Sequence, residues 1–98
     1  MITSKQRAQL RGLANPIETI LQVGKSGVID TLTKQVDDAL TARELIKLRA
    51  LENAPVSARE AAEELAQLTR SEVVQVIGTR FVLYRPNPKK KDHIVLAK

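Results

Sequence analysis

Hydrophobic and polar residues alternate along this 98-residue chain with two different periods. In three segments the apolar residues recur every three or four positions, which is typical of amphipathic helices. In four others they alternate with polar residues or run together over four to seven positions, which is typical of strands. The expected helices cover residues 4–14, 29–42 and 58–68, and the expected strands cover residues 17–23, 45–51, 73–77 and 81–84. The pattern therefore predicts an α/β fold in the order α-β-α-β-α-β-β.

Capping and turn residues support these boundaries. Thr3 and Ser57 each precede a helical pattern and are followed three positions later by Gln or Glu, the arrangement of a capping box. Asn15-Pro16 ends the first helix, because the residue before proline is disfavoured in the α conformation. Gly78-Thr79 predicts a hairpin with a type II′ turn. We expect a four-stranded mixed sheet with the helices on one face and the hairpin adding an antiparallel edge.

Prolines divide the chain near its C-terminus. Pro86-Asn87-Pro88 follows the last expected strand, and Lys89-Lys90-Lys91 comes directly after it. We therefore expect one domain over residues 1–86 and a basic tail over residues 87–98.

The segment Gly24-Lys25-Ser26-Gly27 joins the first strand to the second helix. Glycine permits backbone conformations closed to other residues and lets a ligand approach the main chain closely. Free N–H groups in the first turn of the helix, together with Lys25, would make a site for a phosphate. A turn without a ligand is the alternative at this point.

We expect a negative φ at Gly27, because a residue that opens a helix usually has one. A nucleotide-binding P-loop is disfavoured, since that motif needs a glycine where the chain has Thr19.

Charge is distributed unevenly along the chain, whose net charge is +5. Residues 1–28 contain four basic residues and one acidic residue, residues 29–77 contain six and nine, and residues 78–98 contain six and one. Such segregation is typical of a nucleic-acid-binding protein, although a solvated basic surface with a tail is the alternative. The acidic third helix, with Glu60, Glu63 and Glu64, should face away from any nucleic acid.

No pattern of catalytic or metal-binding residues is present. The chain has no cysteine, and its one histidine, His93, follows the prolines. We therefore expect no enzymatic activity, no metal site, no cofactor and no small-molecule substrate.

No apolar run approaches the ~20 residues that span a bilayer, and the N-terminus lacks the apolar core of a signal peptide. We expect a cytoplasmic monomer that does not engage membranes. With only Phe81 and Tyr84 as aromatics, an RNA module that stacks bases on a sheet of aromatics is disfavoured.

Several blocks of sequence, taken together and in order, carry a resemblance to a known family. They are Leu10-Arg11-Gly12-Leu13-Ala14, Gln22-Val23-Gly24-Lys25-Ser26-Gly27, Ala42-Arg43-Glu44-Leu45-Ile46-Lys47, and Val76-Ile77-Gly78 with Val82-Leu83-Tyr84-Arg85. Over residues 1 to about 86 the chain resembles the CRM (chloroplast RNA splicing and ribosome maturation) domain, in its stand-alone bacterial form of the YhbY type. A GxxG loop also occurs in KH domains, but there it joins two helices, whereas here it joins a strand to a helix.

The resemblance implies a fold similar to the C-terminal domain of initiation factor three. It also implies RNA binding with the GxxG loop at the contact surface, and association with precursors of the large ribosomal subunit. Gly24, Lys25, Gly27 and Arg43 match family positions.

We therefore expect an rRNA-binding protein that acts in ribosome biogenesis. The expected RNA-binding residues are Gly24, Lys25, Ser26, Gly27, Lys5, Arg7, Arg11 and Arg43, with the basic side chains on one continuous surface. The alternative is a protein–protein adaptor that acts through the acidic third helix or the C-terminal tail.

Overall fold

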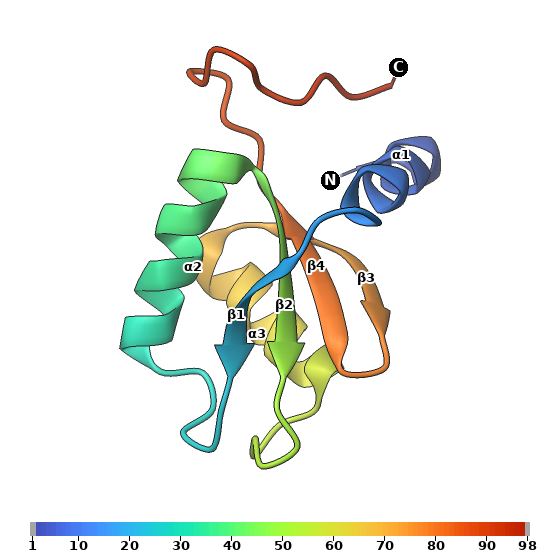
Figure 1. Ribbon diagram of the computed structural model, residues 1–98. Coiled ribbons are helices and arrows are strands. Elements are labelled where there is room, and N and C mark those ends of the chain that lie inside the picture. Colours follow the sequence, from blue (N-terminus) through green and yellow to red (C-terminus); the bar gives the residue numbers. More distant parts are fainter. Residues whose placement is uncertain (1, 98) are drawn as a thin grey trace.

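The computed structural model describes residues 2–97 and contains the seven expected elements in the expected order (Figure 1). The helices are α1 (Ser4–Ala14), α2 (Asp30–Arg43) and α3 (Ala58–Thr69), and the strands are β1 (Thr19–Val23), β2 (Leu45–Ala50), β3 (Glu72–Ile77) and β4 (Arg80–Tyr84). Thr3 and Ser57 form the predicted capping boxes. The α/β class is thus confirmed. Within residues 2–97, no helix combines the length and the apolar character needed to cross a membrane.

The four strands form one mixed sheet in the order β1-β2-β4-β3. β1 and β2 are parallel, and β4 is antiparallel to both of its neighbours. The β3–β4 hairpin therefore adds an antiparallel edge to the sheet, as expected, with β4 inside the sheet and β3 at its edge. The chain passes through α3 to β3 at the far edge, and β4 then returns into the place beside β2. Gly78 has a φ of +60°, and Thr79 is not in the left-handed region, as a type II′ turn requires.

Helices cover both faces of the sheet, not one. α2 and α3 pack on one face, where Leu32, Val36, Leu40, Ala61 and Leu65 meet Ile46, Leu48, Phe81 and Leu83. α1 packs on the other face, where Leu10 and Ala14 meet Leu45, Val74, Val82 and Tyr84. The expectation of a single covered face was wrong because β2 and β4 carry buried apolar side chains on both faces at the end where α1 lies. The rest of the α1 face, toward the other end of the strands, has no helix over it (Figure 1).

The C-terminal segment extends the α1 layer. The side-chain amide of Gln9 donates to and accepts from the backbone of residues 95–97, at 2.8 and 2.7 Å. Glu44, which is only 1% exposed, accepts hydrogen bonds from the backbone N–H groups of Asn87 and Ile94, both at 2.8 Å. A buried carboxylate thus holds this segment at two points.

Candidate nucleic-acid interface

The Gly24–Gly27 segment forms a tight turn directly after β1. The N–H of Gly27 donates to the carbonyl oxygen of Gly24 at 2.9 Å, which places Lys25 and Ser26 at the exposed corner of the turn. Neither side chain has a hydrogen-bond or ion-pair partner among residues 2–97. A cation and a hydroxyl group are therefore free to contact a phosphate, which such groups commonly do in nucleic-acid complexes.

Gly27 has a φ of +70°, so the expectation of a negative φ was wrong. The reason is that α2 does not begin at this residue, because Val28 and Ile29 intervene before Asp30. Gly27 is also buried, and a Cβ added to it would lie 3.1 Å from Cγ of Pro55. Its missing side chain therefore serves the conformation of the turn and its packing on the β2–α3 loop.

The start of α2 is less suited to an anion than the turn is. Asp30 lies in the first turn of α2, so its carboxylate already occupies the position that the helix dipole makes favourable for negative charge. The expected phosphate site on the N–H groups of this helix is therefore weakened. The exposed part of the loop that can still receive a phosphate is the corner formed by Lys25 and Ser26.

The basic residues predicted for one surface are distributed over two ends of the molecule. The Gly24–Gly27 turn follows the C-terminal end of β1, whereas α1 precedes β1 (Figure 1). Arg43 ends the 14-residue α2, which spans about 20 Å at 1.5 Å per residue. Lys25 and Arg43 therefore lie toward opposite ends of α2, and one continuous surface that contains both residues and the α1 bases stays a prediction. Contact of Lys5, Arg11 and Arg43 with RNA stays a prediction.

Arg7 is engaged inside the protein. Its guanidinium group donates to the carbonyl oxygens of Val73 and Val74, the latter at 3.1 Å. These residues lie at the register shift of β3, where a bulge disrupts the regular ladder of hydrogen bonds. Arg7 therefore binds the carbonyl groups that this irregular stretch presents, and an additional contact of Arg7 with RNA stays a prediction.

Three basic residues outside the predicted set lie between the turn and α1. Lys47 and Arg49 of β2 and Arg80 of β4 alternate with residues that pack against α2 and α3, so their side chains project from the α1 face. We call these three residues the basic sheet face. None of them has an ion-pair partner among residues 2–97. The alternation of Lys47 and Arg49 with apolar residues was visible in the sequence, but only the strand pairing brings Arg80 directly opposite Arg49.

The basic sheet face is continuous with the predicted basic residues on both sides. Gln22 pairs with Arg49 and lies two positions before the Gly24–Gly27 turn, which places Lys25 near one end of the face. At the other end, Asn15 borders the face. Its backbone N–H donates a hydrogen bond to the carbonyl oxygen of Arg11, so Asn15 lies one helical turn after Arg11. The turn and Arg11 are therefore linked through the sheet.

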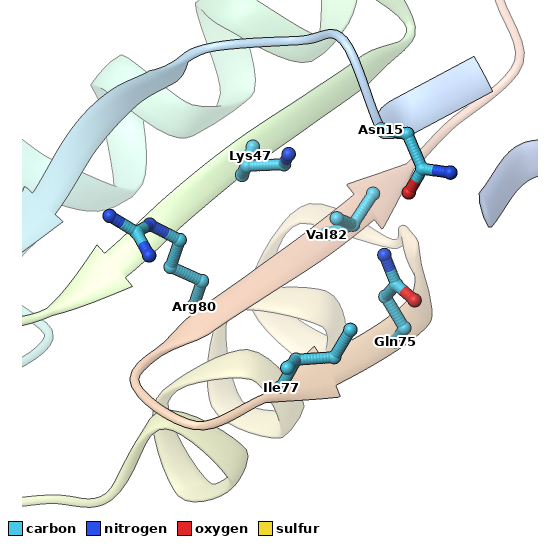
Figure 2. Close-up of a pocket in the computed structure, with 6 residues that line it drawn as sticks. All are labelled: Asn15, Lys47, Gln75, Ile77, Arg80 and Val82. Atoms are coloured by element: carbon cyan, nitrogen blue, oxygen red, sulfur yellow. The ribbon is translucent and has the colours of Figure 1, made fainter. Parts of the chain in front are cut away.

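A hollow of about 150 Å³ opens in this face beside α1 (Figure 2). The residues that line it are Asn15, Lys47, Gln75, Ile77, Arg80 and Val82. Their polar groups are amides or cations, and none of the six is acidic. The hollow therefore combines a positive rim with neutral hydrogen-bonding groups.

The acidic residues of α3 lie on the opposite side of the sheet. Glu60, Glu63 and Glu64 are exposed on a helix whose inner surface packs against the other face. Hydrogen bonds from the backbone and side chain of Ser57 lower the pKa of Glu60 below its usual value. The acidic helix therefore points away from the basic sheet face, and its orientation relative to a bound nucleic acid stays a prediction. Within residues 2–97, no three or more His, Cys, Asp or Glu side chains are grouped so that they could hold a metal ion.

Comparison with known proteins places this chain in a family. A Bacillus subtilis protein named "Probable RNA-binding protein YqeI" is 44% identical over 92 residues, which cover 94% of this chain and 96% of that protein. A Methanocaldococcus jannaschii protein named "Probable RNA-binding protein MJ0652" is 35% identical over 95 residues, covering 95% of this chain and 70% of that protein. The solution structure of the Staphylococcus aureus protein SAV1595, described as a candidate RNA-binding protein, matches with a TM-score of 0.80 and 45% identity and covers 97% of this chain and 99% of that one. Residues 2–85 match the family model of the CRS1 / YhbY (CRM) domain, and the chain belongs to this family.

Proposed function

We propose that this protein binds RNA through the Gly24–Gly27 turn and the basic sheet face. One observation carries the proposal: cations from separate segments lie on one side without acidic partners among residues 2–97, while the acidic helix α3 lies on the other. They are the exposed Lys25, Arg49 and Arg80 and the half-buried Lys47. The relatives named as RNA-binding proteins support RNA as the partner. The protein then acts by binding and does not catalyse a reaction.

We further propose that the bound RNA is rRNA in precursors of the large ribosomal subunit, in the cytoplasm. The likeness to stand-alone proteins of the YhbY type supports this assignment. The mechanism is capture of the RNA backbone, in which each cation displaces a counterion from a phosphate. With about four such contacts, the logarithm of the affinity for single-stranded RNA should fall with the logarithm of salt concentration with a slope of about −3.

Charge reversal tests the binding surface. Lys25→Glu and Arg49→Glu should each weaken binding of an rRNA fragment about tenfold or more, because each turns a phosphate contact into a repulsion. Both residues are exposed, so the fold should be retained, as circular dichroism would verify. Arg59→Glu is the matched control, since Arg59 is an exposed arginine of α3. Equal affinity of all three variants and the wild type would refute the proposed surface.

The ribosomal assignment needs a separate experiment. Tagged protein should sediment with precursors of the large subunit, and crosslinking followed by sequencing should recover rRNA. Depletion of the protein should lead to accumulation of those precursors. Retention on particles that does not respond to salt would favour the adaptor alternative. Ile94 and Leu96 of the tail pack against the buried residues between α1 and the sheet, which weighs against the tail as a docking segment.

A further inference from the structure

The hollow in the basic sheet face has the size and chemistry of a site for one base. Its volume is about 150 Å³, which equals that of an engineered cavity of about 150 Å³ that admits a benzene ring. A pyrimidine base is a single six-membered ring of similar size. A base that is paired inside an RNA duplex cannot enter such a hollow, whereas the base of an unpaired nucleotide can.

The polar groups of the hollow match the edge of a base. Asn15 and Gln75 each carry an amide, which offers both a donor and an acceptor. Neither side-chain amide has a hydrogen-bond partner among residues 2–97. Figure 2 shows the two amide ends directed toward one another beside Val82. An amide can pair with the adjacent donor and acceptor of either uracil or cytosine, because rotation of the side chain exchanges its two ends.

The remaining lining residues suit the ring and its phosphates. Val82 and Ile77 supply apolar surface, and Ile77 is 67% exposed although it is a large aliphatic residue. The planar guanidinium group of Arg80 can lie against a base, which replaces the aromatic stacking that this face lacks. Lys47 lies on the neighbouring strand, within the same lining, where it can neutralise a phosphate of the same strand.

From this arrangement we infer that the hollow binds one unpaired pyrimidine nucleotide of the RNA. The inference rests on the proposed RNA-binding function and adds a preference to it. The Gly24–Gly27 turn and the basic residues hold the RNA backbone irrespective of sequence, and the hollow selects a strand that can present a single unstacked uracil or cytosine.

The test compares three RNAs of equal length: a uridine-rich single strand, an adenosine-rich single strand and a blunt duplex. The wild type should bind the uridine-rich strand most tightly. The double variant Asn15→Leu with Gln75→Leu removes both amides and leaves every positive charge in place. It should bind the uridine-rich strand about tenfold more weakly and the duplex with unchanged affinity. Gln67→Leu, at an exposed glutamine of α3 on the opposite side, is the matched control and should behave as the wild type.

The outcomes separate the two proposals. If the wild type binds none of the RNAs, the proposed function fails and the inference fails with it. If the wild type binds RNA but the double variant keeps its preference for the uridine-rich strand, only the inference fails. A wild-type preference for adenosine would also overturn it, because a purine exceeds the single ring that the volume admits.

A measurement on the wild type tests the inference even if the double variant does not fold. In a titration with a short uridine oligonucleotide, the side-chain amide NMR signals of Asn15 and Gln75 should shift together with the backbone signal of Lys25. A shift of Lys25 alone would show that RNA binds at the turn without entering the hollow, and would overturn the inference.

Discussion

Substitution of Gly27 by alanine should destabilise the protein, and the structure gives the size of the effect. At a φ of +70°, an L-residue with a Cβ is strained by about 1–2 kcal/mol. Alanine also stiffens the unfolded chain, which offsets about 0.4–1 kcal/mol. The new Cβ would lie 3.1 Å from Cγ of Pro55, a close contact that adds to the strain. We therefore expect a net loss of about 1 kcal/mol, which lowers the melting temperature of a domain of this size by about 4–8 °C.

Two other glycines supply matched controls for the Gly27 variant. Gly12 lies inside α1 with open space around it, so Gly12→Ala should stabilise the protein by about 0.5–1 kcal/mol. Gly78 has a φ of +60° but no atom near the added Cβ, so Gly78→Ala reports the strain without the contact. Thermal melting of the three variants measures these changes in stability, and an RNA titration of the same variants measures any change in binding. An unchanged or raised melting temperature for Gly27→Ala would refute this reasoning.

Three further predictions concern groups that hold the fold. Arg7→Met should lower the free energy of unfolding in urea titrations by about 1 kcal/mol, because it removes the donor to two β3 carbonyl groups, whereas Arg11→Met one turn away should change it little. Glu44→Gln should speed hydrogen exchange of the two tail amides that Glu44 binds by about tenfold or more, since one carboxylate oxygen becomes a donor; unchanged exchange would show that the tail is held by packing alone. Burial, and then the charge of Glu44, raise the pKa of Tyr84 above its usual value of 10.0, so the unfolded chain releases this proton at lower pH than the folded one. Stability should therefore decline as the pH rises above about 10, and the decline should be smaller in Tyr84→Phe.

Most of the fold was predictable because it depends on local patterns. The capping boxes at Thr3 and Ser57 and the Gly78-Thr79 turn specify their own geometry through neighbouring residues. The position of α1 was not predictable in the same way, because it depends on apolar residues of β2 and β4 that face away from α2 and α3. Which strands lie side by side decides how large that second apolar surface is, and no single segment contains this information.

The candidate site was only partly predictable for the same reason. The Gly24–Gly27 turn is one continuous segment, so its exposed corner could be expected from the sequence. Arg49 and Arg80 are 31 positions apart and become neighbours only through the β2–β4 pairing. Arg7 shows the opposite failure: its charge suggested a phosphate contact, but a bulge in β3 engages its guanidinium group.

The two like charges of Arg49 and Arg80 should lower the stability of the free protein, although both residues are proposed to bind RNA. The two residues lie directly opposite each other on antiparallel strands, where like charges are destabilising and opposite charges contribute about 0.2–1 kcal/mol. Arg49→Glu should therefore raise the melting temperature by a few degrees while it weakens binding of RNA. Arg49→Gln, which removes the repulsion without adding an attraction, should fall between the wild type and Arg49→Glu in both measurements. If Arg49→Glu instead lowered both the melting temperature and the affinity, Arg49 would be needed for packing, and its charge could not be assigned to RNA binding.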